Sequence, residues 1–377
     1  SLSRMPRRTI RTAGNRMKHK DYWRKRFELL EQSQNRTGKE CFAEIEKQYR
    51  RAQKEIEGKI AVWYQRFAVN NEISLQETKK LIHSRELAEF KWDVNEYIRY
   101  GKENAMNQKW LKELENASAR YHITCLEVIK LQMQQSLEVL FGNQLDSLDS
   151  VMRSVYTDGY YHTAYEIHKG LGVGWEFAVL DEKTINKVIK KPWAVDGKNF
   201  SERVWGNRRK LVNELNQALV QNMILGQNPQ KAIDTIARKM KVSKQNAGKI
   251  VMTEEAFFSS AAQRDCFYEL GVEQFEIVAT LDSGTSPLCR QLDGQRFPML
   301  QYEAGVTAPP FHVYCRTTTV PSFEDSLDTS GERAARGRNS KIYYVPAGMT
   351  YKQWENAFVN GDMSGLQKTE FGKGDNK

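Results

Sequence analysis

The sequence predicts an α+β protein in which a long helical N-terminal domain is followed by a mixed helical domain with a small antiparallel sheet. Apolar residues recur at spacings of three and four over most of the first 270 positions, which is the period of an amphipathic helix. The stretch from Thr280 to Pro321 differs, because it combines strand-like runs with a turn dipeptide and several Asp, Cys and His residues. These observations set the fold class and the place of a candidate site.

With 377 residues, of which 40% are hydrophobic, the chain can bury a sizeable core. Changes in charge and apolar content divide it into five expected segments. These are a basic arm (1–26), a helical domain (27–150), an α+β domain (151–321), a linker (322–340) and a short docking module (341–377). The last segment contains a helix too short to be stable unless it packs on another surface.

Helix predictions follow the apolar spacing and the capping residues. A first helix is expected over 27–67, a second begins at the capping box of Ser74 and Glu77, and further helices cover 87–100, 117–148 and 151–170. Later helices are expected over 202–225, from the Asn228-Pro229 cap, and over 243–270. The face of the first helix is formed by Phe42, Ile45, Tyr49, Ala52, Ile56, Ile60, Trp63 and Phe67.

Three strands are expected near the C-terminal part of the chain, at 273–281, 291–297 and 316–320. Apolar and polar residues alternate in the first, which predicts a half-buried strand. The dipeptide Asp293-Gly294 is typical of a hairpin turn, and Pro321 is expected to end the third strand. The three strands should form one sheet.

The net charge of +10 is concentrated at the start of the sequence. Residues 1–26 contain ten basic residues and one acid, a balance of +9. Such an arm is attracted to nucleic-acid phosphates, although a solvated segment or an arm that docks on an acidic protein surface has the same composition. The candidate nucleic-acid contacts are Arg4, Arg7, Arg8, Arg11, Arg16, Lys18, Lys20, Arg24, Lys25 and Arg26.

Neither a membrane span nor a secretory signal is expected, because the sequence has no run of 18 apolar residues and no apolar N-terminal region. Its five cysteines are odd in number and scattered, which does not indicate a disulfide framework and fits a reducing compartment.

The motif His312-x-x-Cys315 has the spacing of two metal ligands on one turn, and Cys289 offers a third donor. A closed structural zinc site would need a fourth, for which Asp282 is the candidate. The alternative needs no cofactor: Asp282 pairs with Arg316 or accepts backbone hydrogen bonds, and the cysteines are buried. In either case Asp282, Asp293, Gly294 and Arg316 form a structural clasp that holds the Pro-rich loop to the sheet.

A catalytic interpretation is disfavoured. A Cys/His/Asp set is present, but neither Cys289 nor Cys315 lies at a predicted helix N-terminus and no oxyanion-binding arrangement is recognisable. A hydrolytic metal site would need a general base, and Asp293 is assigned to its turn. We therefore expect no catalytic residues and no enzyme.

The order and spacing of these motifs resemble the phage head morphogenesis family, the minor head proteins that include the F protein of phage Mu. The resemblance rests on the strand ending at Asp282, T-S-P-x-C at Thr285, L-D-G-x-x-F at Leu292 and P-P-x-H-x-x-C-R at Pro309. Two upstream passages, SARYHITCLEVIKLQMQ and PWAVDGKNFSERVW, are similar to the longer subgroup from phages of Gram-positive hosts.

The resemblance implies a low-copy virion component that acts in head assembly at the portal protein and contacts packaged DNA, with which it can be ejected. Scaffold or major capsid protein are further partners, and the locations implied are the virion interior and, during assembly, the host cytoplasm. Some relatives have a second cysteine where this chain has Ser286, which completes a Cys/Cys/His/Cys zinc set that is incomplete here. A metal-dependent hydrolase, a toxin-like effector and a cellular nucleic-acid-binding module remain the alternatives.

Overall fold

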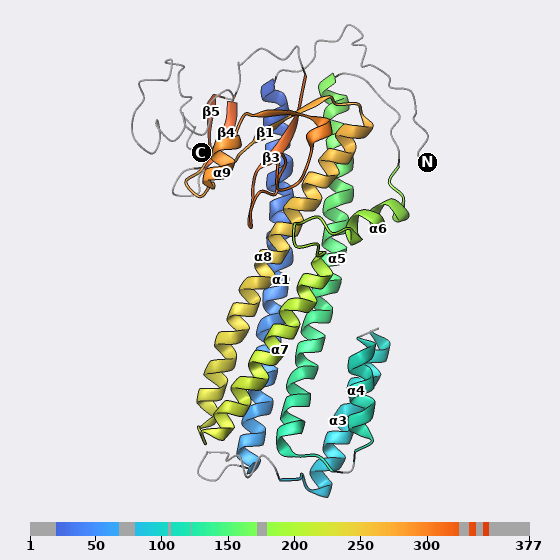
Figure 1. The fold of residues 1–377 in the computed structure, drawn as a ribbon, viewed down its shortest axis with the longest axis vertical. Helices are drawn as coiled ribbons and strands as arrows, with labels where there is room; N and C mark the ends of the chain where they lie inside the picture. Colours follow the sequence, from blue (N-terminus) through green and yellow to red (C-terminus); the bar gives the residue numbers. More distant parts are fainter. Residues whose placement is uncertain are drawn as a thin grey trace, which may run out of the picture. The chain divides into compact units, whose positions relative to one another are not determined.

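Figure 1 shows the protein as a computed structural model, in which helices predominate and a small sheet lies in the C-terminal part of the chain. The structure describes residues 20–67, 80–104, 107–120, 122–171 and 179–323, and the backbone of 332–336 and 342–346. The α+β fold class is confirmed. Most of the arm, the Ser74 capping box and the helix of the docking module lie outside the described residues.

Two of the described helices are longer than the sequence predicted. Two expected segments, 117–148 and 151–170, are largely joined in one helix from Cys125, in line with the helical pattern that continues beyond Asp149. Two others are joined in one helix from Pro229, so the predicted restart at Ser243 is wrong. The bounds are α1 (Lys20–Phe67), α3 (Ser84–Glu103), α4 (Gln108–Ser118), α5 (Cys125–Leu171), α6 (Glu182–Lys190), α7 (Phe200–Ile224), α8 (Pro229–Glu269) and α9 (Pro287–Leu292).

Contacts divide the chain into two compact units that are discontinuous in sequence. One, the helical unit, comprises residues 40–150 and 198–251; the other, the sheet unit, comprises 1–39, 151–197 and 252–377. Helices α1, α5 and α8 contribute residues to both units. This division differs from the consecutive domains expected from the sequence, because helices of more than 40 residues continue through both units.

The core of the helical unit is formed by apolar faces of α1, α5 and α7. Six of the predicted α1 positions, from Ile45 to Trp63, are buried. Aromatic side chains in this core also make polar contacts: Trp63 Nε1 donates to Gln132 Oε1 at 2.9 Å, and Tyr64 donates to Asn222 Oδ1 at 2.6 Å. The helical period therefore identified the buried face of α1 correctly.

In the sheet unit, β1 (Gln274–Val278) lies between β2 (Arg296–Pro298) and β3 (Thr318–Ser322), and both pairings are antiparallel. The predicted three-stranded sheet is thus confirmed, with two corrections of its bounds. The start of the second predicted strand is helical, because residues up to Leu292 belong to α9. Pro321 does not end β3 but pairs with Phe275, which is possible because β3 is an edge strand.

The half-buried character predicted for β1 is wrong. Phe275 and Ile277 are buried as expected, but Glu276 and Val278 on the other face are buried too. Both faces of this central strand are therefore covered, and the glutamate needs an internal partner.

Two segments in the last 60 residues form a pair of strands that the sequence did not predict. The two short strands form an antiparallel pair: β4 (Glu332–Arg336), in the expected linker, and β5 (Ile342–Pro346), at the start of the expected docking module.

Among the described residues, no helix has an apolar run long enough to cross a membrane.

Candidate functional site

The first feature of the site is an ion pair between the start of α1 and the central strand. Arg24 Nε donates to Glu276 Oε1 at 2.9 Å, and both side chains are almost completely buried. Arg296 on β2 donates to the other carboxylate oxygen at 3.1 Å. The buried glutamate is thereby satisfied by two cations, one of them 252 residues away in the sequence.

This geometry corrects part of the nucleic-acid prediction. The guanidinium of Arg24 is buried against Glu276, and Arg26 donates to Glu166 through Nε at 2.8 Å, so both are engaged inside the protein. Lys25 between them is exposed. The structure therefore disfavours Arg24 as a phosphate contact. Lys25 stays a candidate, together with the first seven cations of the arm, whose side chains lie outside the described residues.

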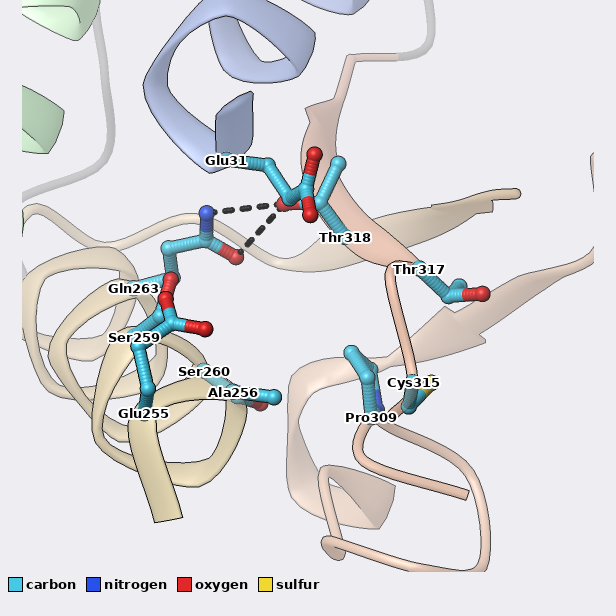
Figure 2. Close-up of a pocket in the computed structure, with 10 residues that line it drawn as sticks. All are labelled: Glu31, Glu255, Ala256, Ser259, Ser260, Gln263, Pro309, Cys315, Thr317 and Thr318. Atoms are coloured by element: carbon cyan, nitrogen blue, oxygen red, sulfur yellow. Dashed lines mark hydrogen bonds between the residues drawn. The ribbon is translucent and has the colours of Figure 1, made fainter. Parts of the chain in front are cut away.

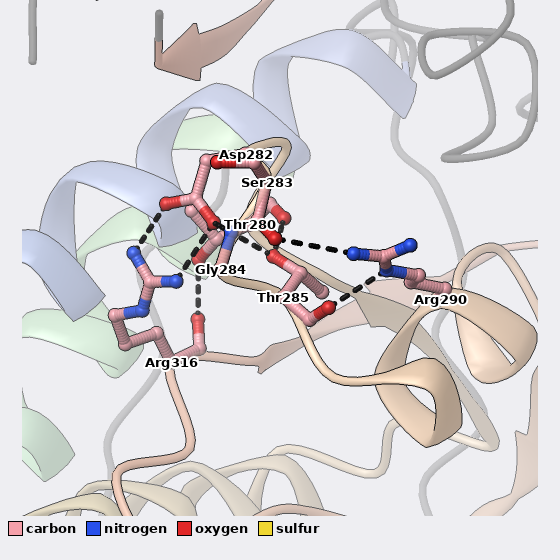
Figure 3. A network of polar contacts seen from close by, with 7 residues as sticks. All are labelled: Thr280, Asp282, Ser283, Gly284, Thr285, Arg290 and Arg316. Atoms are coloured by element: carbon pink, nitrogen blue, oxygen red, sulfur yellow. Dashed lines mark hydrogen bonds and ion pairs between the residues drawn. The ribbon is translucent and has the colours of Figure 1, made fainter. Parts of the chain in front are cut away.

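The second feature is the predicted pairing of Asp282 with Arg316 at the ends of β1 and β3, drawn in Figure 3. Arg316 Nη2 donates to Asp282 Oδ1 at 2.8 Å, and Nη1 donates to Oδ2. Oδ1 also accepts from the Gly284 N–H at 2.9 Å and from the Thr285 hydroxyl at 3.1 Å. Burial alone would raise the pKa of Asp282, but the hydrogen bonds and charge of Arg316 lower it below its ordinary value.

The surrounding loop is fixed by further side-chain to backbone hydrogen bonds. The Thr280 hydroxyl donates to the Arg316 carbonyl at 2.8 Å, and Arg290 Nε donates to the Thr285 carbonyl at 2.7 Å, as Figure 3 shows. These contacts connect the chain after β1, the end of α9 and the chain before β3. Asp282 is consequently engaged by Arg316 and by its own loop.

Asp293 and Gly294 occupy the turn that leads from α9 into β2. Asp293 is buried, and its Oδ1 accepts from the Ala279 N–H at 2.9 Å. Gly294 has φ +81°, and its N–H donates to the Ile277 carbonyl at 2.8 Å. A positive φ favours glycine, so the residue that the sequence assigned to a turn has a conformational reason to be there.

The third feature is a cluster of Cys289, His312 and Cys315. Cys289 Sγ lies 3.1 Å from His312 Nε2 and 3.8 Å from Cys315 Sγ. The three donor atoms lie within 4.8 Å of one another, and Asp282 is not part of the group. The structure therefore brings together three of the four predicted metal ligands and assigns the fourth, Asp282, to Arg316.

Local structure explains how the cluster forms. Cys289 lies in the first turn of α9, where its N–H donates to the Ser286 hydroxyl at 3.2 Å, so the expectation that it would not lie at a helix N-terminus is wrong. His312 and Cys315 are joined by a tight turn in which Tyr314 has φ +61° and Cys315 N–H donates to the His312 carbonyl. The sulphur atoms pack against Ala279 and Phe311.

The two thiols and the imidazole perturb one another. The hydrogen bond from Cys289, with that of His312, lowers the pKa of Cys315 well below its ordinary value despite burial. The same sulphur contact, together with burial, raises the pKa of Cys289, and the bond to Cys315 raises that of His312. Of the pair, Cys315 is the sulphur that more readily becomes a thiolate.

A cavity of about 10 Å³ lies beside Cys315, enough space for about one water molecule. Figure 2 shows Glu255 and Ser259 of α8 on one wall, with Cys315 and Pro309 on the other. Gln263 Nε2 donates to the Thr318 hydroxyl at 2.9 Å in the same region. Burial raises the pKa of Glu255 well above its ordinary value, and the nearby charge of Glu31 raises it further.

Sequence reasoning missed Glu276, Glu255 and Gln263, which are the polar residues that contact the sheet or the cavity. Glu276 was assigned to a solvent-exposed face because it alternates with apolar residues. Glu255 and Gln263 lie on a predicted helix, where glutamate and glutamine side chains are usually exposed to solvent. The one signal in the sequence that these side chains are buried was the number of polar residues in the otherwise apolar segment 252–263 of α8.

These features lie largely within a segment that is shared with known proteins. Residues 213–320 match a family described as Phage Mu protein F like protein. The segment includes α9, all three donors of the Cys/His cluster and most of the sheet. This segment thus matches the phage Mu F-like family that the resemblance predicted.

One particular relative covers more of the chain. Minor head protein GP7 of Bacillus phage SPP1 is 21% identical over 270 residues, which is 65% of this chain and 85% of that protein. No solved structure matches the chain. A structural role in the phage head is the function that these comparisons support.

Proposed function

We propose that this protein is a low-copy minor head protein that lies inside the virion, binds the portal protein during head assembly and contacts packaged DNA. The observation that carries the proposal is the similarity to a minor head protein over 85% of that relative's length. Long amphipathic helices suit docking on an oligomeric partner, and the basic arm suits a polyanion. Ejection with the DNA is part of the same proposal.

The DNA contact is assigned to the part of the arm before Arg24. Residues 1–20 contain seven basic residues and no acid, a balance of +7. Cations that neutralise phosphates release counterions, and each such contact adds about 0.9 to the salt dependence of binding. Seven contacts would give a slope of roughly −6 in a plot of log affinity against log salt concentration.

A matched pair of variants tests this assignment by equal changes of charge. Replacing Arg4, Arg7, Arg8 and Arg11 by Gln should reduce the salt slope by about 4, because four phosphate contacts are lost. The control replaces four exposed lysines of α6 and its C-terminal end, Lys183, Lys187, Lys190 and Lys191, and should leave the slope nearly unchanged. Equal losses in both variants would show that net charge, and not the arm, provides the affinity.

Placement in the head is tested on particles. Quantitative mass spectrometry of purified virions, DNA-free heads and ghosts after ejection should find the protein at low copy in virions and depleted in ghosts. Cross-linking of heads should join it to the portal protein. Absence from virions would overturn the proposed function, whereas cross-links only to scaffold or major capsid protein would reject the portal as its partner.

A further inference from the structure

The Cys289, His312 and Cys315 side chains form the only set of three possible metal ligands found in the described part of the chain. They come from two segments, since Cys289 belongs to α9 and the other two belong to the loop before β3. Cys289 and Cys315 are buried, and His312 is partly exposed. A ligand shared by the three would join that loop to α9.

The distance between the two sulphurs matches that in a tetrahedral zinc site, whereas the sulphur and nitrogen atoms would have to move apart by about 0.4 Å to bind the ion. Zinc lies about 2.3 Å from sulphur and about 2.0–2.1 Å from nitrogen, which at tetrahedral angles separates two sulphurs by about 3.8 Å and sulphur from nitrogen by about 3.5 Å. The two sulphurs here are 3.8 Å apart, and Cys289 Sγ is 3.1 Å from His312 Nε2. A disulfide would need about 2.05 Å between the sulphurs.

The imidazole is oriented as in a metal ligand. His312 Nδ1 lies 2.9 Å from the Val313 carbonyl oxygen, which can only accept, so Nδ1 carries the proton. Nε2, which lies 3.1 Å from Cys289 Sγ, is then the nitrogen available to bind a metal. A hydrogen bond from the non-ligating nitrogen to a carbonyl is the arrangement that fixes metal-binding histidines.

The backbone holds the ligands in place before any ion binds. Tyr314 has φ +61°, a conformation that non-glycine residues rarely adopt and that is retained where the surroundings impose it. It produces the turn that places His312 and Cys315 side by side. Ser286 caps α9 and fixes the N–H of Cys289.

We propose that Cys289, His312 and Cys315 bind one zinc ion, with water in the fourth position. Thiolate and imidazole donors favour zinc over harder cations, and two thiolates neutralise its charge in this buried site. The ion joins the Pro-rich loop to α9 beside the Asp282 and Arg316 pair. This proposal is independent of the proposed function, because it concerns the folded chain wherever the protein is located.

The test uses the full chain purified under reducing conditions. Metal analysis should return one equivalent of zinc per chain, and a mercurial that modifies thiols should release it into a colorimetric chelator. Cys289→Ser, Cys315→Ser and His312→Ala should each lose the bound zinc. The matched control is Cys266→Ser, which changes another buried cysteine, on α8, and should retain one equivalent.

Spectroscopy of the unsubstituted protein keeps the proposal testable even where a variant fails to fold. Cobalt(II) loaded in place of zinc should give a thiolate-to-cobalt charge-transfer band and the intense visible bands of a tetrahedral site. Failure of the reduced protein to bind added zinc or cobalt would overturn the proposal. So would a mass 2 Da lower with two unreactive thiols under reducing conditions, which would identify a disulfide in place of a metal site.

Discussion

The helical unit and the sheet unit are stabilised by different kinds of contact. In the helical unit, buried apolar residues such as Ile45, Ile56 and Leu137 form the core, and the polar contacts within it are mostly between neutral side chains, apart from the pair of Arg208 with the buried Glu138. In the sheet unit, the strands are joined to their neighbours through Glu276 and Asp282, both of which are charge-paired. Apolar packing still stabilises the fold when a side chain shifts slightly. A buried ion pair stabilises it only when the partner of opposite charge lies at one particular position.

This difference explains why the sheet unit carries the site. Removing one partner of a buried ion pair leaves an uncompensated charge, so each pairing fixes where its strand can lie. The Cys/His cluster is positioned by the same strand ends and by α9. We expect the effects of substitutions on stability to differ between the two units in their size, in their salt dependence and in their pH dependence.

The largest effect is expected from Arg24→Ala. It removes the buried cation that pairs with the carboxylate of Glu276, and should lower the free energy of unfolding by about 3–5 kcal/mol. Urea denaturation followed by circular dichroism measures the change. Replacing Arg24 and Glu276 together by Leu should recover much of the loss, because the charge that then loses its partner, Arg296, is partly exposed to solvent.

Two controls delimit this prediction. Lys25→Ala, at the neighbouring exposed position, should change stability by less than about 0.5 kcal/mol. Ile56→Ala in the helical unit should cost about 2–5 kcal/mol through a cavity, and no single charge substitution should rescue it. An Arg24→Ala loss as small as that of Lys25→Ala would show that the ion pair does not hold α1 to the sheet.

A smaller effect is expected from Asp282→Ala. The pair with Arg316 is only partly buried, so its loss should cost about 2 kcal/mol, between the values for buried and exposed pairs. The comparison is Glu89→Ala, which removes the exposed pair with Arg66 in the helical unit and should cost about 0–1 kcal/mol. Equal losses in the two variants, measured by urea denaturation, would remove the clasp as a stabilising feature.

The smallest effect, of opposite sign, is expected from Glu255→Gln. The folded state raises the pKa of Glu255, so above about pH 4.5 the folded chain retains a proton that the unfolded chain has released, and stability falls as pH rises. The amide is neutral at every pH. The variant should therefore melt at a higher temperature than the parent protein at pH 8 and close to it at pH 4.5.

The exposed Glu303→Gln is the matched control and should leave the pH dependence of the melting temperature nearly unchanged. If the melting temperatures of the parent protein and of Glu255→Gln differ by the same amount at both pH values, the expected dependence of stability on the protonation of Glu255 is contradicted. In that case the amide would act through packing and not through the lost proton.

The sequence by itself determined the fold class, the buried face of α1, the three strands in one sheet and the similarity of residues 213–320 to the phage Mu F-like family. It also identified Cys289, His312 and Cys315 as a group, because ligand spacing along a turn is a local property. Helical period, strand alternation and turn residues such as Gly294 depend on the backbone conformation of neighbouring positions, and short segments are enough to read them. They do not depend on which distant segment packs against them.

Only the tertiary structure decided which charges are buried and with whom they pair. Arg24 looked like any other cation of a basic arm, and Glu276 like the exposed residue of an alternating strand, until α1 covered the second face of β1. Asp282 could have been a metal ligand or the partner of Arg316, and the choice depended on where the end of β3 lies. Burial converts such residues from solvated groups into groups that require a partner, and burial is set by packing between segments far apart in the chain.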